Sequence, residues 1–385
     1  MLQYHYAGEE LERAERIEFQ KPQKTYIDKV HATIRTIARR LISRTDVPVP
    51  HPPPKGFLRQ PLSRRQKDVL NGALGKPYAT QNVEQQGKLK NIGIAECGEE
   101  MVSLEDVVSD RAQVSFSTRK LPEGCRLWVM KLLKLRRQED VPGRVMCIRH
   151  GVAQKIAQVC RSLNDADLMM HVEDCWRPPA VQEGLFIRRL IKVARDYSDL
   201  PWEEIKTIAM SLTASVPGLA GHQAGAAIDW RLRYMGAKED FLPLGNDYPD
   251  GGAVSSLHFP YLTAAEWKTR IIFSRTMQMA GFRLLSTEDW HGSFGDIGLG
   301  FDDTGWSVQM TEAIYGPLRD FHLESGNIEC YSMADLQKNY LTDQEIRMLV
   351  DKSRQRKSSG EYIQTLEGLV AKLHHGRNVA QKSAV

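Results

Sequence analysis

Two short segments of this 385-residue chain carry side chains that together could bind a metal ion. In residues 221–229, His222 stands in a glycine-flanked turn, and Asp229 follows within an apolar run that alternates as a strand would. An ionised carboxylate in such a strand is costly unless it is paired or bound to a cation. In the second segment, Glu288 and His291 are three positions apart, beside Trp290.

Two histidines and one carboxylate form a three-ligand set, which leaves the fourth position of zinc open to water. Zinc in such a set lowers the pKa of its water to about 7, and a nearby carboxylate can then take the proton. We therefore predict one zinc ion per chain, held by His222, Asp229 and His291, with Glu288 as catalytic base. Each segment alone is weak, because a histidine and an aspartate seven residues apart also occur in buried cores.

The elements that must position these residues are a mixture of helices and strands. Their order lacks the regular alternation of a doubly wound sheet, so we predict an α+β domain. Its sheet should be mixed and largely antiparallel, with flanking helices. The apolar spacing predicts helices over 152–163, 179–193 and 263–280, the last ending at Gly281, and strands over 167–172 and 226–233.

The domain is expected to span residues 70–321, between two helical extensions. The first, residues 1–54, ends in the proline-rich linker VPVPHPPP, because proline fixes φ and removes hydrogen-bond donors. The second, residues 322–385, is charged and amphipathic. Any oligomer is expected to form through these extensions.

Composition excludes several classes of function. The 52 basic residues barely exceed the 48 acidic ones, so the charge does not favour a nucleic-acid partner. No apolar run approaches the roughly 18 to 20 residues that span a bilayer, so we expect no membrane partner. The polar start of the chain does not resemble a secretory signal, and the six cysteines include no CxxC pair. We expect a cytoplasmic protein without a disulfide framework.

Around the candidate ligands, the sequence resembles the zinc D-alanyl-D-alanine dipeptidases, the family that includes the vancomycin-resistance dipeptidase. The family pattern S-x-H-x-x-G-x-A-x-D corresponds to residues 220–229, and E-x-W-H followed by Y/F-G-D corresponds to 288–296. The segment D-C-W-R-P at 174–178 resembles the family's D-G-Y-R-P. Y-A-T at 78–80 and A-I-Y-G-P at 313–317 resemble the early and closing motifs.

The resemblance implies the same three zinc ligands and the same base, and it adds two roles. Arg177 would stabilise the oxyanion of the tetrahedral intermediate, because a planar cation with several donors suits a developing negative oxygen. Tyr78 would line the amino-terminal side of the substrate. The implied activity is hydrolysis of D-Ala-D-Ala or a related dipeptide that contains a D-residue.

Departures from the family pattern concentrate in the substrate pocket. The family's serine before the ligand histidine is Ala220 here. Pro249 stands where the family places an aspartate that holds the substrate ammonium, and Asp250 follows it as the candidate for that role. We therefore expect D-Ala-D-Ala to be a poor substrate. Cys175, close to Arg177, is predicted to be a buried apolar filler and no ligand.

Two alternatives to the dipeptidase remain open. A D,D- or L,D-carboxypeptidase that acts on peptidoglycan stems would keep all the metal residues and differ only in the pocket. A catalytically silent zinc-binding regulatory module would keep the metal, but it would need neither Glu288 nor Arg177.

Overall fold

The computed structural model describes the central part of the chain, with gaps. The residues described are 32, 89, 92–118, 144–197, 200–214, 221–237, 241–249, 253–257, 259, 262–285, 287–300, 312–332, 342, 344, 346–348 and 350–351. Most of the two predicted helical extensions lies outside these residues, so the domain boundaries stay predictions.

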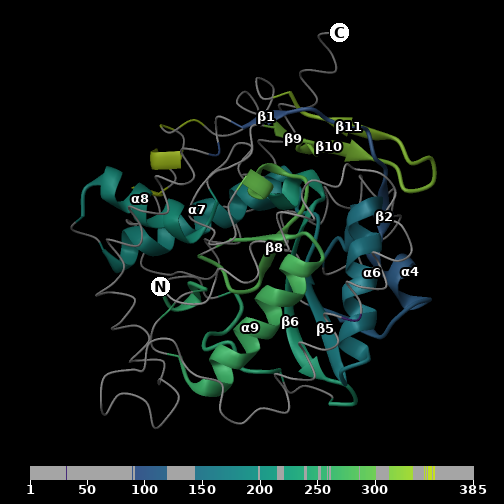
Figure 1. Ribbon diagram of the computed structural model, residues 1–385. Helices are drawn as coiled ribbons and strands as arrows, with labels where there is room; N and C mark the ends of the chain where they lie inside the picture. The colour runs from purple at the N-terminus through teal and green to yellow at the C-terminus, as the bar shows by residue number, and fades with distance from the viewer. Residues whose placement is uncertain are drawn as a thin grey trace.

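A five-stranded mixed sheet forms the centre of the molecule (Figure 1). Its strand order is β3-β5-β6-β8-β7, in which β3 and β5 are parallel and all other neighbours are antiparallel. The strands are β3 (Val114–Phe116), β5 (Leu168–Asp174), β6 (Ala227–Tyr234), β8 (His291–Ser293) and β7 (Arg283–Leu284). The described residues thus confirm the predicted α+β class and its largely antiparallel mixed sheet.

Helices pack on one face of this sheet because side chains alternate along each strand. The inward residues of β5 and β6 belong to the same apolar core as α4 (Leu104–Ser109), α6 (His150–Asn164) and α9 (Ala264–Met279). Trp230 of β6, for example, stacks on Phe273 of α9 with ring centroids 4.6 Å apart. The opposite face of β5 and β6 is left for polar side chains, including Asp229.

The start and end of α9 follow from its sequence. Thr263 and Glu266 form a capping box, in which each side chain accepts a hydrogen bond from the other's backbone N–H. Gly281, just past the helix, has a φ of 85°, which favours glycine. The predicted end at Gly281 is confirmed.

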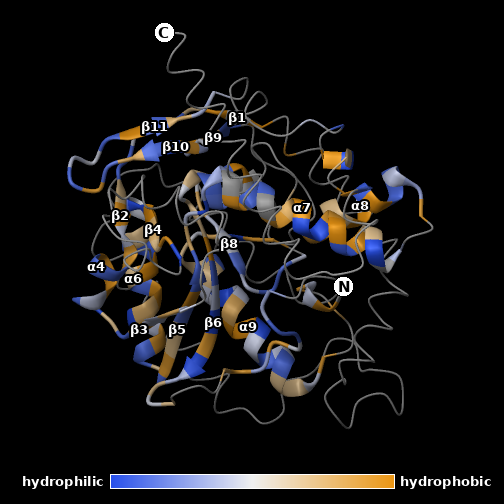
Figure 2. Cartoon of the chain, turned by 180° about the vertical axis from the view of Figure 1, so that it is seen from behind, coloured by the Kyte–Doolittle hydropathy of each residue, from blue (hydrophilic) through white to orange (hydrophobic). Residues whose placement is uncertain are grey.

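Two further helices, α7 (Pro179–Asp196) and α8 (Trp202–Leu212), lie beyond the end of β5 at which the chain leaves the sheet (Figure 1). Pro179 occupies the first turn of α7, where its missing N–H costs nothing. Apolar residues of α7 pack against α8 in a second core, and α7 carries both hydrophilic and hydrophobic colours in Figure 2. The polar part of α7 therefore remains available for a cavity.

Three small sheets and three 3-10 turns complete the described structure. None of its helices is long and apolar enough to cross a membrane. The paired strands are β2 (Met101–Ser103) with β4 (Cys147–Arg149), β1 (Gly93–Ile94) with β9 (Glu312–Ala313), and β10 (Leu318–Phe321) with β11 (Ile328–Cys330). The 3-10 turns are η2 (Gly221–Ala224), η3 (Ala253–Ser255) and η4 (Ile297–Gly300).

Arg149, at the end of β4, fixes the turn η2 to its surroundings. Its fully buried guanidinium donates through Nε to the carbonyl of Ala224 at 2.9 Å and pairs with Glu96 at 3.0 Å. The backbone N–H of Arg149 also donates to the carbonyl of Gly225. A buried charge with this many partners holds the turn in one place.

Candidate metal centre

His222, Asp229 and His291 meet on the polar face of the sheet. Asp229 and His291 are direct cross-strand partners in β6 and β8, so their side chains project to the same face. His222 comes from η2, just before β6. His222 Nε2 lies 3.1 Å and His291 Nδ1 lies 3.0 Å from Asp229 Oδ1. All three residues are buried.

This geometry could hold a metal ion. One ligand atom from each residue lies within 4.8 Å of the others. Ligand bonds of about 2.0 to 2.2 Å in a tetrahedron place neighbouring ligand atoms about 3.3 Å apart, close to the separations seen here. The three residues predicted as ligands therefore lie together and could hold a metal ion, and the choice of zinc stays a prediction.

Each histidine is oriented by its second ring nitrogen. His222 Nδ1 donates to the backbone carbonyl of Cys175 at 2.6 Å, so the lone pair of Nε2 faces Asp229. His291 Nε2 lies 3.0 Å from Ser293 Oγ, which leaves Nδ1 for the site. Partners of this kind fix the tautomer and the ring orientation of metal-binding histidines.

The Asp229 carboxylate is shared between the histidines and two further donors. Tyr248 Oη donates to Oδ2 at 3.0 Å, and an Nη of Arg177 does so at 3.4 Å. Burial raises the pKa of Asp229, but the charge and hydrogen bond of His222, and then those of His291, lower it well below its usual range. Oδ1 thereby faces the two imidazoles as part of an ionised carboxylate.

Two glycines are needed for close approach around the site. A Cβ on Gly221 would lie 2.6 Å from Asp296 Oδ2. Gly292 lies between His291 and Ser293 in β8. A Cβ on Gly292 would point toward α9 and overlap Met277 of that helix. Hydrogen is therefore the only side chain that fits at either position without movement of these neighbours.

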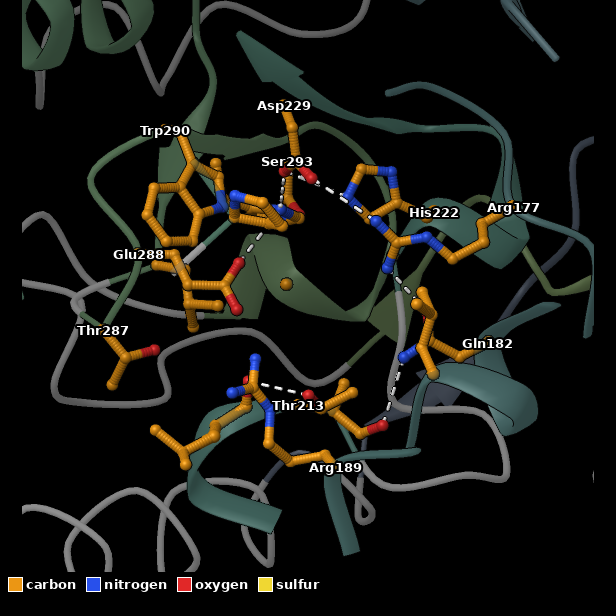
Figure 3. Close-up of a pocket in the computed structure, with 18 of the residues that line it drawn as sticks. Arg177, Gln182, Arg189, Thr213, His222, Asp229, Thr287, Glu288, Trp290 and Ser293 are labelled. Atoms are coloured by element: carbon orange, nitrogen blue, oxygen red, sulfur yellow. Dashed lines mark hydrogen bonds and ion pairs between the residues drawn. The ribbon is translucent and has the colours of Figure 1, made fainter. Parts of the chain in front are cut away.

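Glu288 lies beside the ligand group and is not part of it. It is partly buried at 26% side-chain exposure, and its Oε2 is 3.8 Å from His291 Nδ1. Burial raises the pKa of Glu288, and the charge of His291 opposes this without cancelling it. Its carboxylate points into the cavity in front of Trp290 (Figure 3). This placement suits an acid–base residue.

Arg177 is held next to the ligands by three side chains. Its guanidinium donates to Asp174 Oδ2 at 3.0 and 3.3 Å and to Gln182 Oε1 at 2.7 Å, besides its contact with Asp229. Burial lowers the pKa of Arg177, but Asp174 and then Asp229 raise it overall, so the group stays charged. Arg177 lines the cavity, and its oxyanion role stays a prediction.

A buried arginine, Arg270, joins the two loops that flank the site. Arg270 of α9 donates to the carbonyls of Leu244 and Val254 at 2.7 and 2.8 Å and pairs with Asp289 Oδ2 at 2.7 Å. Asn246 donates to the other oxygen of Asp289 at 3.3 Å. The loop that carries Tyr248 is thus tied to the turn that carries Glu288.

The ligand group opens into a cavity of about 290 Å³. Trp290 forms part of its wall and meets Tyr248 edge to face, with ring centroids 5.3 Å apart. Trp176, one residue before Arg177, packs against Phe321 in a buried core and donates to the carbonyl of Gln223.

The remaining predicted residues have different outcomes. Tyr78 and Asp250, proposed to bind substrate, lie outside the described residues, as does Ala220. Cys175 is fully buried, as predicted, and burial raises the pKa of its thiol well above the usual range. Its backbone carbonyl contributes to the site, by accepting from His222.

Sequence reasoning assigned no role to Tyr248 or Ser293. Ser293 could have been found, because it lies two positions after His291 in a strand and therefore shares its face. Tyr248 sits in the segment L-G-N-D-Y-P-D, and nothing in the local pattern indicates that its hydroxyl reaches Asp229.

Comparison with known proteins adds no relative. No protein-family model matches the chain, and no curated protein is significantly similar to it. The functional argument therefore depends on the residues of the site.

Proposed function

We propose that this protein is a zinc metallopeptidase that hydrolyses D-Ala-D-Ala or a related dipeptide containing a D-residue. The observation that carries the proposal is the convergence of two imidazoles and one carboxylate beside Glu288, at a cavity. Two nitrogen ligands and one oxygen ligand suit zinc, whereas calcium and magnesium prefer oxygen ligands throughout. The preference for D-residues is supported by the sequence resemblance alone.

The chemistry divides between the metal and the chain. Bound at His222, Asp229 and His291, zinc would polarise the scissile carbonyl and acidify the attacking water. Glu288 would take a proton from that water and pass it to the nitrogen of the leaving amine as the C–N bond breaks. Arg177 would donate to the developing oxyanion.

The size of the cavity favours a dipeptidase over a carboxypeptidase that accepts peptidoglycan stems. Small-molecule pockets are usually about 300 to 1,000 Å³, so a cavity of about 290 Å³ suits a small ligand. A silent zinc-binding module is disfavoured because such a module needs no carboxylate base in the cavity.

Metal analysis of the purified protein together with a dipeptide screen tests this proposal. We expect about one zinc per chain, as in other three-ligand catalytic sites. The screen should include D,D-, L,D- and L,L-dipeptides and a stem pentapeptide. Cleavage of D-residue dipeptides is expected. Cleavage of the pentapeptide alone would favour the carboxypeptidase, and a zinc-loaded protein inactive on every peptide would favour the silent module.

Glu288→Gln separates the base from the ligands. The amide keeps the shape but cannot accept the proton, so we expect turnover to fall by about 10² or more with zinc retained. Glu312→Gln, at an exposed position in β9, is the matched control and should change neither quantity. Loss of zinc from the Glu288 variant would make that residue a ligand.

A further inference from the structure

The end of the cavity away from the metal ligands is strongly cationic. Three of its lining residues there are basic: Arg188, Arg189 and Lys192 of α7. A fourth basic residue, Arg283 of β7, lines the cavity opposite Ser293. Among the described residues, the only carboxylates that line the cavity are Asp229 and Glu288, and both belong to the metal end. The carboxylates therefore lie at the metal end of the cavity, and most of the basic side chains lie at the other end.

The spacing along α7 explains how one helix supplies this wall. Gln182, Leu185, Arg189 and Lys192 follow one another at intervals of three or four residues, so they share one face of the helix. The opposite face packs against α8. Figure 3 shows Arg189 across the cavity from Trp290 and Asp229, with its side chain extending toward the space between them.

The balance of charge identifies the kind of ligand that this cavity would attract. Arg177 is already paired with Asp174 and Asp229, so the positive charge that a ligand would meet comes from the four other basic side chains of the cavity and from a bound zinc ion. A cleft lined by one sign of charge concentrates ligands of the opposite sign. A neutral dipeptide has one carboxylate and one ammonium, so its ammonium would be repelled and its carboxylate would engage only part of this wall.

We propose that the substrate is an acidic short peptide, with a side-chain carboxylate in addition to its terminal one. The cationic wall of Arg188, Arg189, Lys192 and Arg283 would bind the second carboxylate. Arginine suits this task because its planar donors match a carboxylate in a two-pronged arrangement. This inference rests on the proposed peptidase function and assigns its substrate class.

Pairs of dipeptides that differ only in one charge test the inference. The kcat/KM of the zinc-loaded enzyme is compared for D-Asp against D-Asn and for D-Glu against D-Gln, with D-Ala as the other residue, in both orders. We expect at least one acidic member to exceed its amide counterpart about tenfold, the lower end for hydrogen bonds to charged groups at a partly exposed site. Equal values in every pair overturn the inference.

Variants locate the effect on the wall. The double change Arg189→Gln and Lys192→Gln removes two of the four basic side chains and should lower the ratio of acidic to amide substrate. Arg195→Gln is the matched control, because it removes one positive charge from an exposed position of the same helix outside the cavity lining. A ratio that is unchanged by the double substitution contradicts the assignment to α7.

A binding measurement keeps this inference separate from the proposed function. Calorimetry on the zinc-loaded Glu288→Gln protein gives the affinity for each intact dipeptide. Tighter binding of the acidic members, in a protein whose wild type cleaves none of them, supports the inference while the peptidase proposal fails. If the enzyme cleaves dipeptides but the acidic ones are preferred neither in binding nor in kcat/KM, the peptidase proposal stands and the inference about the substrate class fails.

Discussion

The two ends of the cavity are built on different physical principles. At the metal end, His222, Asp229 and His291 are buried, and each is held by a named partner. At the other end, Arg188 and Lys192 are exposed on a single helix. The metal end depends on the fixed positions of buried side chains, whereas the other end acts through the positive charge of exposed ones. Changes at the first should therefore act in an all-or-none manner, and changes at the second by degrees.

The largest effect is expected from removal of a ligand. His222→Ala or His291→Ala should abolish both zinc binding and activity, because two ligands do not complete a catalytic zinc site. Metal content after dialysis and turnover are the measurements. His150→Ala is the control, since His150 is a partly exposed histidine at the start of α6, outside the cavity lining. Full zinc occupancy in both variants would contradict the assignment of His222 and His291 as zinc ligands.

The second largest effect is expected from loss of the Arg270–Asp289 ion pair, which joins the two loops beside the candidate ligands. Asp289→Ala leaves the fully buried Arg270 without its carboxylate, which should cost about 3 to 5 kcal/mol of unfolding free energy. Glu329→Ala breaks the exposed pair with Arg319 and should cost about 0.2 to 1 kcal/mol. Urea denaturation of both variants measures the difference. Similar losses in the two would show that burial does not set the strength of the inner pair.

A smaller effect is expected from the donor to the outer oxygen of Asp229. Tyr248→Phe removes one hydrogen bond, and partners of metal ligands typically contribute about 10 to 100-fold in metal affinity, so zinc affinity should fall about tenfold. Tyr315→Phe is the control, because it removes a comparable hydrogen bond to Glu99 outside the cavity lining. Unchanged zinc affinity in the Tyr248 variant would mean that Arg177, and not the hydroxyl of Tyr248, orients Asp229.

The same contrast explains how far the sequence could predict the molecule. The strand that carries Asp229 shows the alternation of a half-buried strand, and the helix over 263–280 has a capping box at one end and a glycine at the other. These are local signals, so both elements were predictable. The grouping of the candidate metal ligands was predictable because a buried carboxylate is costly without a partner.

The contacts between distant segments could not be predicted in this way. Arg270 meets Asp289 and the carbonyl of Leu244 only where α9 packs against two loops, and no local pattern specifies these contacts. The helix over 179–193 was likewise predictable as an element. The packing of α8 decides which face of this helix lines the cavity, so the cationic wall could be recognised only in the folded chain.

The smallest predicted effect is that of salt on substrate binding. Raising the ionic strength from about 0.01 M to about 1 M shortens the Debye length from about 30 to 3 Å, so charges at an exposed rim lose most of their reach. The KM of the preferred acidic dipeptide should therefore rise severalfold, because Arg188 and Lys192 are exposed. Zinc content should hold, because the ligands are buried and screened far less. The amide counterpart of the same dipeptide is the control, and its KM should change little. An equal rise for both substrates would mean that salt acts on the protein as a whole, and the division of the cavity into a rigid end and a charged end would fail.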